Sequence, residues 1–139
     1  MDIAKKTKKE IVSHKMSRVR AQETSIEKAM GSALWKAGLR GYRKNVRGIT
    51  GTPDFCWKKK KIIVFCDSSF WHGHDWQQRK KDIKVRKKFW FKKIEDNIAR
   101  DKKINKQLQQ DGWTVLRFWD FDIKNKPRKC IQKIAIAFR

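Results

Sequence analysis

The segment Ile62–Phe65 constrains the fold of this 139-residue chain most, because its four residues are all apolar. A strand that is apolar on both faces has to be covered on both sides, as the central strands of α/β proteins are. We therefore predict a buried strand over Lys61–Cys66. Asp54–Trp57 before it and Trp113–Trp119 after it have the composition of further strands.

Helical patterns flank these strands. Thr24-Ser-Ile-Glu27 is a capping box, and apolar residues then recur at helical spacing from Ile26 to Ala37. We expect a long helix over about Arg86–Gln110, a last amphipathic helix over Cys130–Phe138, and a further short strand within Tyr42–Arg47. The order helix, three strands, helix, strand, helix predicts a mixed α/β sandwich.

The charge of the chain indicates its partner. The sequence has 37 Lys+Arg against 14 Asp+Glu, which gives a formal net charge of +23. Such an excess on a small protein favours a polyanionic partner. Nucleic acid is the first choice, and an anionic membrane surface is the weaker one, because the basic residues are spread over the whole chain.

The length fits one domain, which we place at residues 21–139 after a basic N-terminal arm at residues 1–20. We expect the arm to become ordered mainly on binding. The sequence has no apolar run of about 18 residues that would span a membrane, and no secretory signal. Its three cysteines are too few for a disulfide scaffold, so we expect a cytosolic protein.

Asp101 is an unusual residue of the predicted long helix. It falls near the middle of an apolar stripe formed by Phe91, Ile94, Ile98, Ile104 and Leu108. A carboxylate that faces a core is costly unless it is paired or hydrogen-bonded. Two interpretations stay open: a partly buried salt bridge to a Lys or Arg, and a residue that points into an active site.

A second set of candidates lies where two predicted strands begin and end. Gly51-Thr-Pro-Asp54 starts one strand, and Cys66-Asp67 ends the next, followed by Ser-Ser-Phe-Trp-His72-Gly-His74. Adjacent strands would bring Asp54 close to Cys66 and Asp67. Oxygen ligands gathered there suit Mg²⁺, and a nearby His can act as a base toward water or an acid toward a leaving oxygen. These groups are the ones that phosphodiester hydrolysis needs.

Taken together, these motifs resemble the very-short-patch repair (Vsr) DNA mismatch endonucleases of the PD-(D/E)xK restriction-endonuclease-like superfamily. The resemblance covers about Met16 to Ile123. Its landmarks are MSRVRAQETSIEKAM, Gly51-Thr-Pro-Asp54, Ile62–Cys66 with Phe70-Trp71-His72, Phe89-Trp90 through Lys93-Ile94-Glu95-Asp96-Asn97 to Arg100-Asp101, and Gly112-Trp-Thr-Val-Leu-Arg-Phe-Trp119. The fold that it implies is a three-layer sandwich with a central mixed sheet flanked by helices.

The resemblance implies a metal site. Asp54 would bind the catalytic Mg²⁺, and the backbone carbonyl of Cys66 would supply the next contact. Glu27 would reach the metal through water, although its place in the capping box leaves helix capping as an alternative role.

The resemblance also implies an acid–base group. His72 matches the catalytic His of the family and would act as general acid or base. Asp67 would support the metal-bound water or pair with His72. Asp101 would lie beside His72, which agrees with its place in the apolar stripe.

Several further positions would contact DNA. Phe70, Trp71 and Trp90 match aromatic residues that the family inserts beside a mismatched pair, where unstacking costs least. Core packing is the alternative, and for Trp90 the two readings are equal. The basic residues expected to contact phosphates include Arg18, Arg20, Lys58, Lys59, Lys60, Lys80, Lys81, Lys87 and Lys88.

The sequence departs from the family at its structural Zn²⁺ site. The ligand positions would be Ser69, His74, Trp76 and Phe121, and only His74 is a plausible ligand. We therefore expect no structural Zn²⁺. Packing around Trp76 and Phe121 would take over its stabilising role.

The activity implied by the resemblance is Mg²⁺-dependent nicking of one strand of double-stranded DNA at a T·G mismatch. The enzyme would act as a monomer in the bacterial cytosol or nucleoid, with a functional link to a DNA cytosine methyltransferase. Two alternatives stay open. One is a sequence-specific nicking or restriction-type endonuclease on the same scaffold, and the other is a nucleic-acid-binding module without catalysis.

Overall fold

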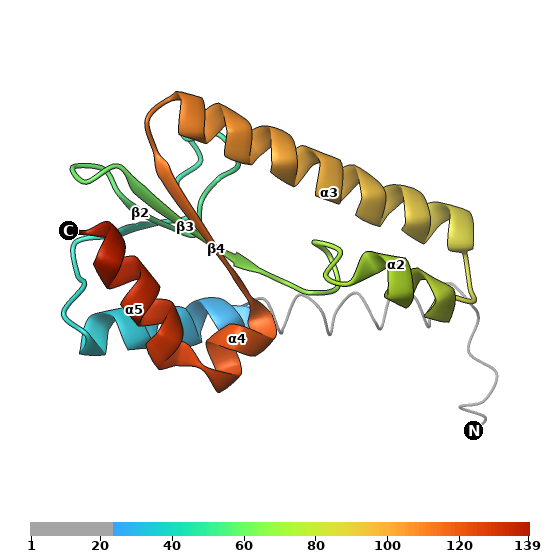
Figure 1. Cartoon of the computed structure of the whole chain (residues 1–139), viewed down its shortest axis with the longest axis horizontal. Helices are drawn as coiled ribbons and strands as arrows, with labels where there is room; N and C mark the ends of the chain where they lie inside the picture. The colour runs from blue at the N-terminus through green and yellow to red at the C-terminus, as the bar shows by residue number, and fades with distance from the viewer. Residues whose placement is uncertain (1–23) are drawn as a thin grey trace, which may run out of the picture.

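The structure, a computed structural model, describes residues 24–139, and a four-stranded sheet lies at its centre (Figure 1). The strands lie in the order β1-β2-β3-β4 across the sheet. β1 pairs with β2 and β2 with β3 in antiparallel fashion, whereas β3 and β4 are parallel. The strands are β1 (Arg43–Lys44), β2 (Phe55–Trp57), β3 (Ile62–Asp67) and β4 (Thr114–Trp119). The expected basic arm at residues 1–20 lies outside the described residues.

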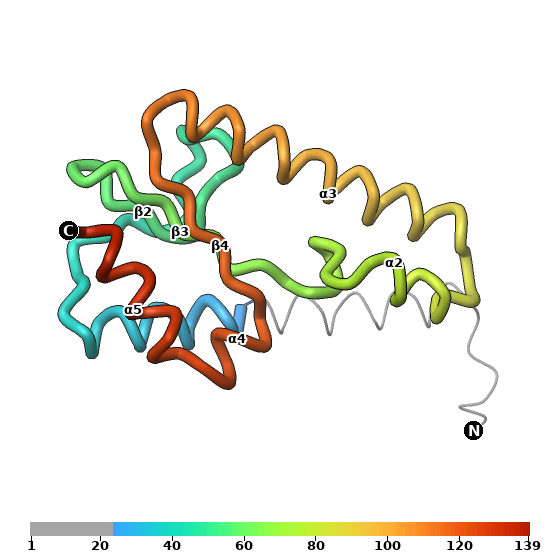
Figure 2. The backbone as a smooth tube through the Cα atoms, viewed as in Figure 1, coloured from blue at the N-terminus to red at the C-terminus, as the bar shows by residue number. Residues whose placement is uncertain are grey.

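Helices cover both faces of the sheet, as the tube in Figure 2 shows most simply. A helix at residues 24–36 forms one layer with α4 (Asp120–Asn125) and α5 (Pro127–Ala137). The long helix α3 (Lys87–Gln110) forms the other layer. Beside its first half lies α2 (Trp76–Arg79), which continues into a 3₁₀ turn at Lys80–Asp82. None of the helices in the described part of the chain is long and apolar enough to cross a membrane.

Two hydrophobic cores lie on opposite faces of β3. Ile62 and Val64 pack in the core beneath the helix 24–36 and α5, whereas Ile63 and Phe65 pack in the core beneath α3. All four residues are buried. This alternation confirms the central strand and the mixed α/β sandwich that the sequence predicts, and the architecture is consistent with a restriction-endonuclease-like fold.

The structure differs from the expected elements at the edges. The strand expected within Tyr42–Arg47 is only Arg43–Lys44, because Asn45 takes a left-handed φ of 50° that turns the chain. The last helix begins at Pro127 rather than Cys130, since proline suits the first turn of a helix. The short helices α2 and α4 have no counterpart among the expected elements, because each is too short to show a hydrophobic period.

The central strand should be the part of the sheet that is most sensitive to truncation. Val64→Ala removes two methyl groups from a side chain with 0% exposure, so we expect it to lower the free energy of unfolding by about 1–3 kcal/mol. Urea denaturation measures this loss. Val85→Ala is the matched control at a side chain that is 40% exposed, and it should change stability little. Equal losses in the two variants would contradict the burial of β3.

Candidate active site

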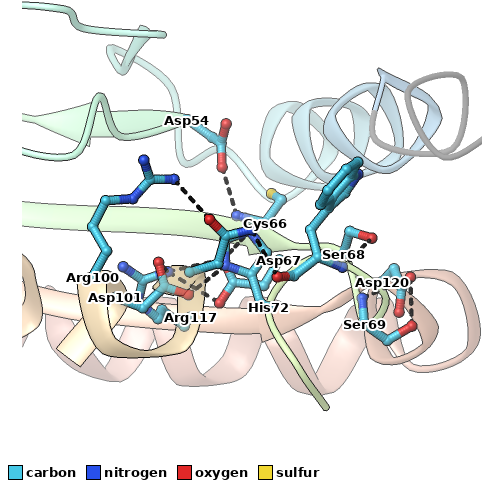
Figure 3. Close-up of polar contacts among 12 residues, drawn as sticks. Asp54, Cys66, Asp67, Ser68, Ser69, His72, Arg100, Asp101, Arg117 and Asp120 are labelled. Carbon is cyan, nitrogen blue, oxygen red and sulfur yellow. Dashed lines mark hydrogen bonds and ion pairs between the residues drawn. The ribbon is translucent and has the colours of Figure 1, made fainter. Parts of the chain in front are cut away.

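The candidate residues meet at the carboxyl end of β3 (Figure 3). The backbone N–H of Cys66 donates a hydrogen bond to Oδ2 of Asp54 at 2.7 Å. This bond joins the turn that precedes β2 to the end of the neighbouring strand. The pairing of β2 with β3 therefore brings Asp54 next to Cys66, as adjacent strands were expected to do.

A second carboxyl group lies against Asp54. The pKa of Asp54 is raised to about 8, mainly by burial and next by a side-chain hydrogen bond between Asp54 and Glu27. Two carboxyl groups in contact must share a proton or bind a cation, because two negative charges this close repel each other. The side chain of Glu27 therefore has a contact beyond the cap of its own helix.

The Asp54 end of the site offers oxygen ligands that fit a divalent cation. Two carboxyl groups and the Cys66 carbonyl are hard donors, which Mg²⁺ prefers while it keeps several waters. Burial raises the pKa of the Cys66 thiol, so that side chain stays protonated and is unsuited to bind a metal as a thiolate. Among residues 24–139, no three His, Cys, Asp or Glu side chains are arranged around one metal position. A bound cation would therefore depend on the backbone carbonyl and on water.

His72 lies on the other side of the end of β3. Its Nδ1–H donates a hydrogen bond to Oδ2 of Asp101 at 2.5 Å, and its Nε2 lies 3.8 Å from Oδ1 of Asp67. Burial lowers the pKa of His72, but the hydrogen bond to Asp101 and the charge of Asp67 outweigh it and raise the pKa overall. The protonated imidazole is thus favoured up to higher pH than in a free histidine.

Arg117 completes this side of the site, and the sequence analysis missed it. Its Nη1 donates to both carboxylate oxygens of Asp67, at 3.0 and 3.2 Å, and lies 3.7 Å from Oδ1 of Asp101. Asp101 thus has the partly buried ion pair that one interpretation expected, and it also contacts the candidate histidine. A role in an active site stays a prediction. Arg117 follows Val115 by two residues in the predicted strand, so strand alternation indicates that both face the same side of the sheet. This pattern does not indicate which carboxylate Arg117 contacts.

Hydrogen bonds from three other elements hold the loop that carries His72. Asp120 at the start of α4 accepts hydrogen bonds from the backbone N–H and the hydroxyl of Ser69, at 3.1 and 3.0 Å. Nδ2 of Asn97 in α3 donates to the carbonyl of Trp71 at 3.2 Å. Arg79 donates to the carbonyl of Ser69. Three helices therefore hold the part of the loop that precedes His72.

The three aromatic residues expected at a mismatch form one cluster. The ring centroids of Phe70 and Trp71 are 5.2 Å apart, and those of Phe70 and Trp90 are 5.4 Å apart. Trp90 is buried, with 5% of its surface exposed, whereas Phe70 and Trp71 are half-buried. Trp90 thus forms the base of the cluster, and the other two rings lie beside the candidate site.

The positions that would hold zinc in the family make other contacts here. The ring of His74 packs edge-on against Trp119 and Phe121, with centroid distances of 4.8 and 4.7 Å. Ser69 is hydrogen-bonded to Asp120, and the indole N–H of Trp76 donates to Glu95 at 3.0 Å.

The basic residues that were expected to contact phosphates lie in different parts of the structure. Lys80 and Lys81 lie in the 3₁₀ turn after α2, and Lys87 and Lys88 lie in the first turn of α3, three and two residues before Trp90. The exposed run Lys58–Lys60 lies in the turn that enters β3, at the opposite end of that strand from Asp67. The structure does not bring this run to the candidate site. Arg18 and Arg20 lie outside the described residues.

Known proteins resemble this chain over most of its length. The family model described as DNA mismatch endonuclease Vsr matches residues 1–78. Type II nicking enzyme V.HpaIIP of Haemophilus parainfluenzae is 51% identical over 114 residues, which are 82% of this chain and 80% of that protein. Type II nicking enzyme V.NmeDIP of Neisseria meningitidis serogroup C is 47% identical over 120 residues, 86% of this chain and 80% of that protein. DNA mismatch endonuclease Vsr of Escherichia coli (strain K12) is 31% identical over 116 residues, 84% of this chain and 73% of that protein.

The contact between the His72 loop and α3 requires glycine at position 73. Gly73 has a left-handed φ of 70°, and a Cβ there would overlap the side chain of Ile98. We expect Gly73→Ala to destabilise the fold by about 2–4 kcal/mol and to push the loop away from α3. The pKa of His72, followed by NMR, should then fall because the Asp101 contact is lost.

Gly38→Ala is the matched control. Gly38 has a similar φ of 77°, but nothing lies within 4 Å of the added Cβ. This variant should lower the free energy of unfolding by only about 1 kcal/mol, because alanine is strained at that φ, and it should leave the pKa of His72 unchanged. An unchanged pKa in both variants would contradict the packing of the loop on α3.

Proposed function

Because this chain belongs to the Vsr family of DNA mismatch endonucleases, we propose that it nicks one strand of duplex DNA at a T·G mismatch with the help of Mg²⁺. The chain is a DNA endonuclease, and nicking, the mismatch and Mg²⁺ are what we propose in addition. The observation that carries the proposal is the meeting of Asp54, His72 and Asp101 at the end of β3.

The proposed reaction is hydrolysis of one phosphodiester bond. The oxygen of a water molecule bonds to phosphorus and one of its protons is released to solvent, while the bond from phosphorus to the 3′-oxygen breaks. The 3′-oxygen takes a proton, which leaves a 5′-phosphate and a 3′-hydroxyl. His72 supplies that proton from Nε2, since Nδ1 is engaged by Asp101 and the raised pKa favours the protonated ring.

Asp54 and the Cys66 carbonyl would hold Mg²⁺, with Glu27 reaching it through water. When bound, such an ion supplies positive charge that polarises the phosphate and activates water. Asp54 lies on the side of β3 away from Asp101 and His72 (Figure 3). A phosphate between Asp54 and His72 would have the metal donors on one side and the acid on the other.

The aromatic cluster supports the mismatch as substrate. Phe70 and Trp71 directly precede His72 in the chain, and both are partly exposed. The buried ring of Trp90 packs against both of them. Aromatic rings that enter a base stack cost least where pairing is already weak, as at a T·G pair. The exposed Lys87 and Lys88 lie close to this cluster in the chain and would contact neighbouring phosphates.

The proposed substrate also implies where the mismatch comes from. Deamination of 5-methylcytosine turns a C·G pair into a T·G pair. A DNA cytosine methyltransferase that acts on the same DNA would therefore supply the 5-methylcytosines whose deamination gives the mismatches that this enzyme nicks. One chain carries all the groups that the proposed reaction needs, so we propose that it acts as a monomer.

A second candidate is nicking at a specific sequence without a mismatch. The names of V.HpaIIP and V.NmeDIP favour it, because they describe type II nicking enzymes and mention no mismatch. The same hydrolytic groups would serve both reactions. The two candidates differ only in the DNA that the aromatic and basic residues recognise.

One cleavage panel tests the proposal. Purified chain is incubated with end-labelled duplexes, matched and T·G-mismatched in several sequence contexts, with Mg²⁺ or EDTA. We expect one nick beside the mismatched T, only with Mg²⁺. Asp54→Asn keeps an acceptor for the Cys66 N–H but loses the charge, so it should slow nicking at least about 100-fold.

The same panel separates the alternatives. Equal nicking of matched and mismatched duplexes would favour the sequence-specific enzyme. Cutting in EDTA, or full activity of Asp54→Asn, would overturn the metal role of Asp54. Lys124→Met, which removes one exposed charge on α4, is the control and should cut like the unmodified chain.

The pH dependence of nicking tests the role of His72. A general acid needs its proton, so the rate should fall as the pH rises through the raised pKa of His72. Asp101→Asn removes a group that raises this pKa, and the falling limb should move to lower pH with a rate loss of roughly 10–100-fold at neutral pH. Asp96→Asn is the control, because Asp96 is an exposed residue of α3 that pairs with Lys92. An unmoved limb in Asp101→Asn would contradict His72 as the acid.

A further inference from the structure

Only some of the N–H donors of the Arg117 guanidinium have acceptors among the described residues. Nη1 donates to Asp67, and Nε donates to Oδ1 of Asn105 at 2.7 Å. The plane of the group is fixed over the ring of Phe65, with the central carbon 4.0 Å from the ring centroid. Within the described part of the chain, no group accepts a hydrogen bond from Nη2. Two N–H donors of a rigid, charged fork are therefore left for another acceptor.

Arg117 borders two cavities that it shares with His72 and Asp101. One has a volume of about 380 Å³ and is also lined by Thr52 and Arg100. The other has a volume of about 210 Å³ and includes Asp67. Arg117 and His72 thus line the same spaces, and 17% of the Arg117 side chain is exposed.

The two carboxylates beside His72 would repel a phosphate unless a cation lies near them. A phosphodiester that enters beside His72 meets the carboxylates Asp67 and Asp101, which would repel it. Arg117 lies between these two carboxylates and neutralises part of their charge. A guanidinium also forms strong, directed hydrogen bonds to phosphate oxygens, and its fork can serve a carboxylate and a phosphate at the same time.

We propose that Arg117 is a further catalytic residue, whose Nη1 fixes Asp67 while Nη2 donates to a nonbridging oxygen of the scissile phosphate. This inference rests on the proposed nicking of DNA. A fixed donor at that oxygen stabilises the charge that develops in the transition state, and it needs no rearrangement when the reaction occurs. A lysine at position 117 would supply one charged nitrogen and could not make both contacts in this geometry.

A test of this role has to separate it from the support of Asp67. Arg117→Met alone would leave the buried Asp67 carboxylate without its cation, and the fold itself could fail. We therefore compare Asp67→Asn with the double variant Asp67→Asn/Arg117→Met, in which no carboxylate at position 67 is left unpaired. Asp67→Asn/Arg128→Met is the matched control, since it removes an exposed arginine of α5 that has no contact with the site.

The first readout is the single-turnover rate of nicking at saturating enzyme. We expect the double variant to nick at least about tenfold more slowly than Asp67→Asn, because a transition-state donor is lost. Asp67→Asn/Arg117→Lys should recover only part of the rate. Asp67→Asn/Arg128→Met should nick within about threefold of Asp67→Asn, because Arg128 is an exposed residue outside the site. Equal rates in Asp67→Asn and the double variant would overturn the inference, because Arg117 would then act only through Asp67.

The second readout is DNA binding in EDTA, which needs no cutting. If Arg117 contacts a phosphate, its loss should make the slope of log Kd against log salt concentration less steep by about 0.9. If Asp67→Asn nicks too slowly to measure, the salt slopes of Asp67→Asn and Asp67→Asn/Arg117→Met test the phosphate contact instead. Equal slopes would then overturn the inference. A chain without substitutions that cuts no duplex overturns the proposed function instead, so the two failures can be told apart.

Discussion

The parallel pairing of β3 with β4 is the interaction on which the candidate site depends. Two parallel strands cannot be joined by a tight turn, so the chain crosses from one to the other through α3, which covers the sheet. That crossover carries Asp101 back over the end of β3, where His72 lies. The register, which pairs Phe65 with Arg117, brings that arginine to Asp67. One topological requirement thus assembles the whole acid–base side of the site.

The site combines two solutions to the problem of placing carboxylates together. On one side, Asp54 and Glu27 share a hydrogen bond, and burial, that hydrogen bond and the negative charges of Glu27 and Asp67 raise the pKa of Asp54. On the other side, Arg117 balances Asp67 internally, and His72 is paired with Asp101. The first arrangement suits an external cation, whereas the second suits a proton donor with a fixed orientation. A metal-assisted hydrolase needs both.

The sequence predicted those features that depend on local patterns. The run Ile62–Phe65 predicted the central strand, and the helical spacing around Asp101 predicted a carboxylate that faces inward. The partners of Asp67 and Ser69 were not predictable in this way, because Arg117 and Asp120 lie 50 and 51 residues further along the chain. The run Lys58–Lys60 shows the converse: its charge was evident, but only the direction of β3 shows that it lies away from the site.

A crystal structure of the chain with Mn²⁺ and a mismatched duplex tests the central claim most directly, namely that the end of β3 places a cation and an acid on opposite sides of one phosphate. The account predicts an anomalous peak in contact with the carboxylate of Asp54 and the carbonyl oxygen of Cys66. A backbone phosphate should lie between this peak and Nε2 of His72. A peak bound instead by Asp67 and Asp101, or a phosphate out of reach of His72, would contradict it.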